Sequence, residues 1–347
     1  MKIELVETLV CPTCASGFKI RIKKKRKNEI EEGQLICTKC GERFKISTGI
    51  PRFVIDSTKD FVRTEMAFSA KWKKYHKTYH DAKWIALQKK WFLDRFGWKN
   101  ISEFKKFLNS RRHILEAGAG MGNTASLLSS NKQAQVFAID ISDGIEFAYR
   151  KYGTAKNIHF LQADLQKMPF KKRFFDFIFS DQVLHHTNNT QKSFKILTKY
   201  LQKKGIISIY IYKKKGPIRE FTDDYIRKSS TKMTEKECIE LSKELSYLGE
   251  NLAKIKKKIK IPRDIKLLKI KAGTYDIQRF IYWNFIKCWW SEDVPFEQSV
   301  ATNFDWYFPK FAFRHTPNEI KKWFRISKIK ITHFKEIESG ISISGKN

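Results

Sequence analysis

The stretch His113-Ile-Leu-Glu-Ala-Gly-Ala-Gly-Met-Gly122 decides the fold of this chain of 347 residues. It reads as a short apolar strand that runs into a glycine-rich turn, and residues 123–130 have the spacing with which a helix begins. Gly118, Gly120 and Gly122 let the backbone approach a ligand closely, and the N-terminus of the following helix presents free N–H groups. The stretch therefore predicts a ligand-binding turn between a strand and a helix.

A second strand, Val136-Phe-Ala-Ile-Asp140, follows this turn and ends in an acidic residue. Asp140 lies about eighteen residues after Gly122, where the second strand of a doubly wound sheet places a carboxylate against a ribose diol. The turn itself is G-x-G-x-G with Glu116 just before it, whereas the turn that binds a dinucleotide pyrophosphate is G-x-G-x-x-G. This spacing favours S-adenosylmethionine over NAD as the ligand.

The rest of the chain supplies the remaining strands in the order that such a sheet needs. Residues 158–164 read as a third strand that ends in Asp164, a possible acceptor for an adenine amino group, or alternatively a helix cap. Residues 174–181 and 205–212 read as the fourth and fifth strands. Thr316, Pro317 and Glu319 predict a helix that begins with a capping box, and two antiparallel strands follow it. We therefore expect an α/β fold with a doubly wound, seven-stranded Rossmann-like sheet.

This order of motifs closely resembles the class I S-adenosylmethionine-dependent methyltransferases, over about residues 112–212 and the C-terminus. The resemblance implies that residues matching the family's strand ends contact the methionine moiety, the ribose and the adenine of the cofactor. It also implies that some of them form the glycine turn and the loop beside the sulfonium. The implied cofactor-binding residues are Glu116, Gly118, Ala119, Gly120, Asp140, Ile141, Asp164, Leu165, Asp181 and Gln182.

Two Cys-x-x-Cys pairs, separated by 22 residues, lie near the N-terminus. The four cysteines are Cys11, Cys14, Cys37 and Cys40. Each pair places two thiolates on a tight turn, and four thiolates complete a closed tetrahedral zinc site with a structural role and no catalytic one. A segment of this size has too little apolar material to fold without the metal. Cys238 and Cys288 are left over, and we expect both to be buried hydrophobic residues in a reduced protein.

The runs CPxC, CxxCGxxFxI and GIPRF, over about residues 4–54, resemble the small zinc-ribbon proteins that activate tRNA, rRNA and release-factor methyltransferases. Here such a ribbon is fused to the chain that it would otherwise bind. The resemblance is specific for the module and says little about the substrate.

These motifs divide the chain into five expected segments. They are a zinc ribbon (1–55), a helical linker (56–111), the methyltransferase core (112–213), a helical insertion (214–315), and a C-terminal helix with two strands that complete the core (316–347). The core fold does not need the insertion. Because it follows the fifth strand, at the carboxyl edge of the sheet, we expect a mainly helical lid over the cofactor crevice.

The formal net charge of +33 invites a nucleic-acid interpretation. Lysine is spread along the whole chain, however, and forms runs only at residues 23–27, 213–215 and an expected helix at 254–260. Such runs are usually solvated surface. No apolar run is long enough to span a bilayer, and Glu4 and Glu7 interrupt any N-terminal signal sequence. We expect a soluble, cytoplasmic protein.

Methyl transfer from a sulfonium is an in-line displacement that needs alignment, exclusion of water and sometimes a base. The candidates for catalytic residues are His185, His186, Tyr212, Arg279 and Tyr307, with Arg219, Tyr275, Gln278, Asp305 and His315 as further candidates. Residues 216–227, 272–283 and 303–316 are polar-aromatic mixtures that suit a pocket wall. They resemble segments of bacterial ribbon–methyltransferase fusions associated with surface polysaccharide or secondary metabolite pathways. That resemblance implies a small or sugar-like acceptor that is methylated on oxygen.

Two alternatives stay open. An RNA methyltransferase is favoured by the ribbon and the charge, but the Asn/Asp-Pro-Pro-Phe/Tyr motif of amino-group methylases is absent, because residues 180–186 read SDQVLHH. A non-catalytic binding module is disfavoured by the intact turn at residues 116–122 with Asp140, which a chain released from cofactor binding would lose. The sequence does not choose the acceptor, the methylated atom, the base or the oligomeric state.

Overall fold

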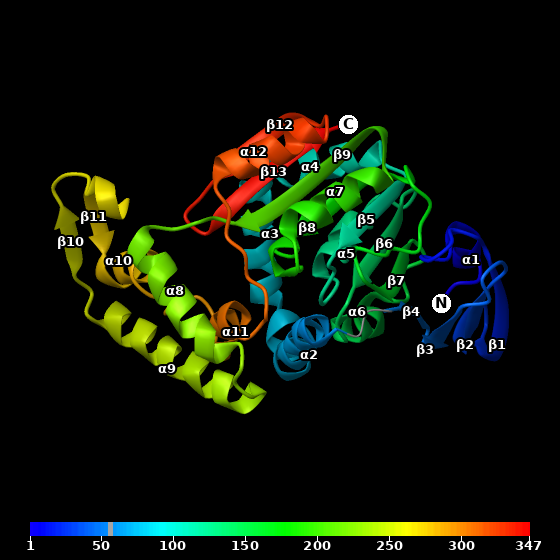
Figure 1. The fold of residues 1–347 in the computed structure, drawn as a ribbon, viewed down its shortest axis with the longest axis horizontal. Helices are drawn as coiled ribbons and strands as arrows, with labels where there is room; N and C mark the ends of the chain where they lie inside the picture. Colours follow the sequence, from blue (N-terminus) through cyan, green and yellow to red (C-terminus); the bar gives the residue numbers. More distant parts are fainter. Residues whose placement is uncertain (55–57) are drawn as a thin grey trace.

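The computed structural model describes residues 1–54 and 58–347, and Figure 1 shows their arrangement. Within these ranges, a seven-stranded sheet in the order β7-β6-β5-β8-β9-β13-β12 forms the centre of the α/β core. Its first five strands are parallel, and β13 pairs antiparallel with both β9 and β12. The predicted doubly wound sheet is therefore confirmed. The strands are β5 (His113–Ala117), β6 (Gln135–Asp140), β7 (Ile158–Ala163), β8 (Phe175–Asp181), β9 (Leu201–Tyr212), β12 (Lys330–Glu336) and β13 (Gly340–Lys346).

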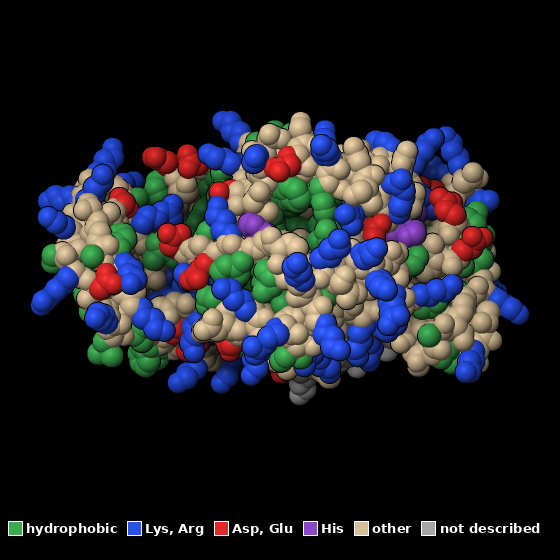
Figure 2. Space-filling model, turned by 90° about the horizontal axis from the view of Figure 1, so that it is seen from above, with side chains coloured by type: hydrophobic (Ala, Val, Ile, Leu, Met, Phe, Trp, Pro, Cys, Tyr) green, Lys and Arg blue, Asp and Glu red, His purple; other side chains and the backbone are tan. Residues whose placement is uncertain are grey.

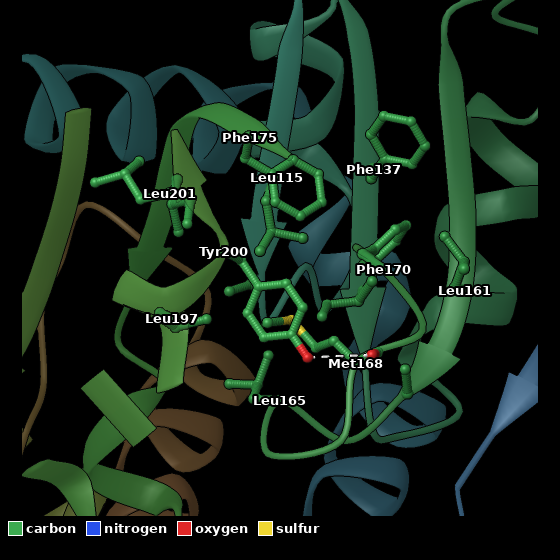
Figure 3. Packing of buried hydrophobic residues seen from close by; sticks show 14 of the residues in the cluster. Leu115, Phe137, Leu161, Leu165, Met168, Phe170, Phe175, Leu197, Tyr200 and Leu201 are labelled. Carbon is green, nitrogen blue, oxygen red and sulfur yellow. Dashed lines mark hydrogen bonds between the residues drawn. The ribbon is translucent and has the colours of Figure 1, made fainter. Parts of the chain in front are cut away.

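Helices cover both faces of this sheet, so the central strands are apolar on both sides. One face packs on α4 (Ile101–Asn109), α5 (Asn123–Leu128) and α6 (Gly144–Tyr152); the other packs on α7 (Thr190–Tyr200) and α12 (Pro317–Ile326). Figure 3 shows Leu115, Phe137 and Leu161 on the α7 side, packed with Phe170 and Tyr200. The predicted capping box is present at the start of α12, where Thr316 and Glu319 bond to each other's backbone N–H groups.

The N-terminal ribbon extends the same sheet. It contains α1 (Leu5–Thr8), β1 (Phe18–Arg26), β2 (Glu29–Cys37), β3 (Arg43–Ser47) and β4 (Ile50–Phe53). Strand β4 pairs in parallel with β7, so an eleven-stranded sheet runs through the described residues. Apolar side chains of the ribbon, Leu35 and Phe53 among them, share one buried cluster with Leu161 and Phe170 of the core. The predicted boundary between residues 55 and 56 lies outside the described residues.

Two long helices precede the first strand of the core. They are α2 (Lys59–Tyr79) and α3 (Ala82–Phe96). The Asp81 side chain caps α3 by accepting from the Trp84 N–H, and Gly97 ends it in the left-handed region. Helix α2 lies against α6 and α11, so the segment expected to be a linker packs across the carboxyl edge of the sheet.

The insertion after β9 is mainly helical, with α8 (Pro217–Ser230), α9 (Glu235–Lys254), α10 (Ile277–Asn284) and α11 (Phe296–Tyr307). Short 3₁₀ turns lie at Leu184–His186 and Lys266–Leu268. The prediction of a helix at residues 254–260 is wrong. Helix α9 ends at Lys254, and β10 (Lys258–Ile261) pairs with β11 (Gly273–Asp276). Residues 258–261 read Lys-Ile-Lys-Ile, a period of two that favours a strand, and Pro262 stops it.

Cys238 and Cys288 are buried as expected. No described helix is both long and apolar enough to cross a bilayer.

Candidate functional site

A cavity of about 1200 Å³ lies between the carboxyl edge of the sheet and the helical insertion. All the residues that the sequence predicts to bind the cofactor line it, from Glu116 to Gln182. Figure 2 shows a hollow with hydrophobic side chains inside it. The five parallel strands bring these residues together because their carboxyl ends meet at one edge.

The glycine turn after β5 forms one wall of the cavity. Gly118 and Gly120 have φ angles of +92° and +49°, which favour glycine. The N–H groups of Gly118 and Ala119 both donate to the Ile139 carbonyl, which ties the turn to β6. A Cβ on Gly118 would overlap Val183, in the loop after β8. A larger residue at position 118 would therefore displace this loop.

Asp140 holds this turn and the next one with the same carboxylate. Oδ2 accepts from the Gly120 N–H over 2.7 Å, and Oδ1 accepts from the N–H and the hydroxyl of Ser142 over 2.8 and 2.6 Å. Because a carboxylate oxygen has two lone pairs, Oδ2 can accept one further hydrogen bond. The geometry leaves room for a single ligand hydroxyl on Oδ2 and not for a bidentate contact.

Glu116 and Asp181 present carboxylate oxygens without hydrogen-bond partners among the described residues. Oε2 of Glu116 and Oδ1 of Asp181 are both buried. Burial raises the pKa of Glu116 well above its ordinary value, and the nearby carboxylates of Asp140 and Asp181 raise it further. The other oxygen of Asp181 pairs with Arg95 Nη2 over 2.8 Å. Two such oxygens beside one cavity suit a cationic ligand group, since an unpartnered buried carboxylate is costly.

The other predicted cofactor residues are Ile141, Asp164, Leu165 and Gln182. Asp164 lines the cavity, and its Oδ1 accepts from the Gln166 N–H over 2.8 Å, which caps a turn and not a helix. Gln182 has a φ of +62°, which is rare for a residue other than glycine and is typical of functional loops.

Of the five predicted catalytic residues, His186 and Tyr212 line the cavity. His186 Nδ1 lies 2.7 Å from the Phe311 carbonyl oxygen. A carbonyl only accepts, so Nδ1 carries the hydrogen and Nε2 is an acceptor; Nε2 has no partner among the described residues. Burial lowers the pKa of His186 to about 4, which keeps the ring neutral near pH 7.

The structure places the other three predicted catalytic residues, His185, Arg279 and Tyr307, outside the cavity lining. The His185 ring stacks on Tyr212 at 3.6 Å, and its Nδ1 accepts from the Tyr212 N–H. The Tyr307 hydroxyl donates to Asp223 Oδ1 over 3.1 Å inside the insertion. Arg279 Nη2 donates to the Trp290 carbonyl. These contacts are all made with other parts of the protein around the cavity.

Several cavity residues were missed by the sequence analysis. They are Lys71, Trp72 and Arg95 of the helices before the core, and Lys215 and Lys287 of the insertion. No motif marks them, because tertiary packing alone brings α2, α3 and the insertion to the carboxyl edge. A Cβ on Gly120 or Gly144 would overlap or crowd the Trp72 ring, which shows how closely α2 covers the turn.

The four cysteines of the ribbon form the second candidate site. The four sulfur atoms all lie within 4.8 Å of one another. The distance is 3.3 Å between Cys14 and Cys37, 3.6 Å between Cys14 and Cys40, and 3.7 Å between Cys11 and Cys40. Four sulfurs at 2.3 Å from one metal ion would lie about 3.8 Å apart. The cluster is thus compatible with a tetrahedral metal site.

Comparison with known proteins agrees with both sites. Residues 115–209 match the family described as "Methyltransferase domain", and residues 2–49 match "Trm112p-like protein". A ubiquinone/menaquinone biosynthesis C-methyltransferase of Wigglesworthia glossinidia brevipalpis is 28% identical over 130 residues, 36% of this chain and 51% of the relative. A malonyl-acyl-carrier-protein O-methyltransferase of Legionella pneumophila is 32% identical over 98 residues, 28% of this chain and 34% of the relative.

The chain spans about half the length of the first relative and a third of the second. Among solved structures, a complex of the Haloferax volcanii Trm112 methyltransferase activator aligns with 84% of this chain and 99% of its own, at 12% identity and a TM-score of 0.40. The chain contains a methyltransferase domain within residues 115–209 and, before it, a Trm112p-like domain with a four-cysteine cluster.

Proposed function

We propose that the chain is an S-adenosylmethionine-dependent methyltransferase that methylates an oxygen atom of a small-molecule or sugar-like acceptor. One observation carries the proposal: the residues expected to bind the cofactor all line one cavity, and the insertion closes the other side of that cavity. S-adenosylmethionine would supply an electrophilic methyl group on its sulfonium. The chain has to bind the two substrates, align them and exclude water.

The cofactor half of the cavity has the groups that this ligand needs. The free oxygens of Glu116 and Asp181 suit the ammonium of the methionine moiety, and the Arg95 guanidinium beside Asp181 suits its carboxylate. Asp140 Oδ2 can accept from one ribose hydroxyl. Asp164 and Leu165, at the end of β7, line the same cavity and are the proposed contacts of the adenine.

His186 supports transfer to oxygen. Its Nε2 is an acceptor at the cavity wall, and the bond from Nδ1 to Phe311 fixes the ring. In the proposed reaction the acceptor oxygen attacks the methyl carbon, the carbon–sulfur bond breaks, and the hydroxyl proton passes to Nε2 of His186. General-base catalysis of this kind contributes about 10² to 10⁴-fold.

We also propose that the four cysteines hold a zinc ion with a structural role. Thiolate-only sites are typical of structural zinc, and four protein ligands leave no open position for chemistry. The spacing of the sulfurs fits this geometry.

Transfer to RNA is the second candidate, and the net charge of +33 is the observation that favours it. Against it, Figure 2 shows Lys and Arg side chains scattered over the visible face, with no continuous track leading into the hollow. A phosphate backbone needs such a track.

The test combines binding with labelling. Calorimetry should show binding of S-adenosylmethionine and its demethylated product, and none of NAD. Incubation with methyl-labelled cofactor and fractionated lysate should then place the label in small metabolites. Absence of cofactor binding would reject the proposal, and label in RNA would select the second candidate.

A further inference from the structure

The two halves of the cavity differ in charge. The cofactor half is lined by the carboxylates of Glu116, Asp140, Asp164 and Asp181, and by the guanidinium of Arg95, which pairs with Asp181. The insertion half is lined by Lys71, Lys215, Arg219 and Lys287, with the carboxylate of Asp305 among them. Lys71 Nζ pairs with Oδ2 of Asp305 at 3.1 Å, and Oδ1 of Asp305 has no hydrogen-bond partner among the described residues. Acids suit a ligand with a sulfonium and an ammonium, whereas the cations at the other end call for an anion.

Lys287 is the clearest case. Its side chain lies in the loop before α11 and is 6% exposed, and it makes no hydrogen bond or ion pair with any residue in the described ranges. The ammonium lies 4.7 Å from the Trp306 ring centre and 5.9 Å from that of Tyr282. Burial and the nearby Arg219 lower its pKa to about 7. The carboxylates of Asp305 and Asp223 lie within electrostatic range and raise this pKa in part, but neither pairs directly with the ammonium. A buried ammonium without a direct counter-ion is costly, and a bound anion would supply one.

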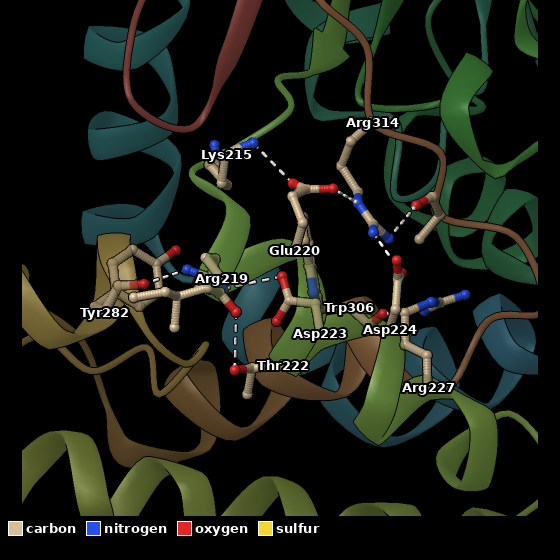
Figure 4. Close-up of polar contacts among 12 residues, drawn as sticks. Lys215, Arg219, Glu220, Thr222, Asp223, Asp224, Arg227, Tyr282, Trp306 and Arg314 are labelled. Carbon is tan, nitrogen blue, oxygen red and sulfur yellow. Dashed lines mark hydrogen bonds and ion pairs between the residues drawn. The ribbon is translucent and has the colours of Figure 1, made fainter. Parts of the chain in front are cut away.

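Arg219 and Lys215 lie next to it. Arg219 Nε donates to Asp223 over 2.9 Å and Nη1 donates to the Tyr282 carbonyl, as Figure 4 shows, while Nη2 has no partner in the described part of the chain. The Lys215 ammonium donates to the carbonyl of Glu338, which is neutral.

Glu220, a further carboxylate near Lys215, is already occupied. Glu220 accepts from the backbone N–H of Lys215 and pairs with Arg314 at 3.0 Å. Burial lowers the pKa of Lys215 and of Lys287, and the nearby charge of Arg219 lowers both further. One bound anion would relieve this repulsion.

An aromatic wall connects this cluster with His186. The Trp306 ring, next to Lys287, lies 4.6 Å from the Tyr212 ring, and Tyr212 lies 5.4 Å from His186 in an edge-on contact. A ligand that reaches from Lys287 to His186 therefore lies along Trp306 and Tyr212.

We propose that Lys215, Arg219 and Lys287 form an anion subsite that binds a carboxylate or phosphate group of the methyl acceptor. The inference rests on the proposed function and narrows its substrate class: the acceptor carries the anion at one end and the methyl-accepting hydroxyl at the other. A neutral sugar would leave two buried lysines without a directly paired counter-ion.

The test uses two probe anions on the full chain, benzoate and inorganic phosphate, with benzamide as the neutral match of benzoate. Each is titrated by calorimetry in the presence of the demethylated cofactor product. We expect saturable binding of at least one anion and none of benzamide. Tighter binding of benzoate assigns a carboxylate acceptor, and tighter binding of phosphate assigns a phosphorylated one.

Variants locate the binding. Lys287→Met keeps the length of the stem and removes the charge, so we expect at least tenfold weaker anion binding and a higher melting temperature in anion-free buffer. Lys287→Arg should retain binding, and Lys215→Met should weaken it independently. Lys266→Met, at an exposed lysine of the same insertion, is the matched control and should bind anions as the wild type does.

Equal anion affinity in the wild type and in both methionine variants, or equal binding of benzoate and benzamide, would overturn the inference. Cofactor affinity is measured separately in each variant. If the wild type does not bind the cofactor, the proposed function is contradicted. If cofactor binding is intact, the anion results bear on the subsite alone.

Discussion

Arg52 on β4 donates from Nη1 to Oε1 of Gln162 on β7 over 2.6 Å, at the register position where the two strands pair. The Gln162 amide in turn donates to the carbonyl of Ile141, the residue after Asp140. One side chain thus links the ribbon to the proposed ribose-binding loop. We predict that Gln162→Leu weakens cofactor binding by roughly 2 to 30-fold, the range of coupling energies of about 0.5–2 kcal/mol. Calorimetry checks this, with metal content as the control that the ribbon is intact.

Asp140→Ala removes the acceptor of the Gly120 N–H and of the Ser142 hydroxyl as well as that of the proposed ribose contact. Hydrogen bonds to a charged group are worth about 1.5–3 kcal/mol each, so we expect cofactor affinity to fall by at least about tenfold. Asp143→Ala, three residues later and exposed, is the matched control. Similar affinities of the two variants would contradict the assignment of Asp140.

Cys37→Ser should reduce bound metal and also destabilise the core. The ribbon and the core share one buried cluster and one sheet, so damage to the ribbon cannot stay confined to it. We expect the free energy of unfolding to fall by more than about 3 kcal/mol, as for other losses of a metal site. Denaturant titration measures this, and Cys288→Ala should keep the metal. Loss of metal with unchanged unfolding of the core would show that the two parts are independent.

His186→Gln should lower kcat by about 100-fold or more and leave cofactor affinity unchanged, since Nε2 is proposed to take the acceptor proton. Arg279→Ala should keep normal turnover, because Arg279 does not line the cavity. The measurement uses the acceptor found by labelling. A large loss of turnover in Arg279→Ala would return that residue to the site.

Cofactor binding should depend on pH through Glu116. Its pKa is raised in the free protein, and a cationic ligand favours the ionised form, so binding should release a proton and strengthen as pH rises toward the raised pKa. The same shift makes the contribution of Glu116 to stability complete below its unfolded pKa and progressively smaller as pH rises through the folded one. Calorimetry in buffers of different ionisation enthalpy counts the proton. Glu116→Gln should release none.

The strand ends could be predicted from the sequence because their signals are local. A glycine turn, or an acid at the end of an apolar run, depends on a few adjacent residues, and the parallel sheet then brings them together. Lys71 and Lys287 could not be predicted, since only the packing of α2 and of the insertion places them over the cavity. The pairing of the ribbon with the core sheet could not be predicted either, because its signal is short. Strand β4 has four residues, one of them proline, and only Arg52 and Phe53 pair with β7.

The continuous sheet gives the basic strand of the ribbon a role of its own. Strand β1 reads FKIRIKKKR and is the outermost strand on that side, with mostly exposed residues. A sheet edge offers unpaired backbone groups on which another chain can add a strand, and lysines on the edge oppose this by repulsion. We predict that the run at residues 23–27 protects this edge, which became the edge of the whole sheet when β4 paired with β7. Because salt screens that repulsion, self-association through β1 should increase with ionic strength, opposite to the behaviour of a nucleic-acid contact.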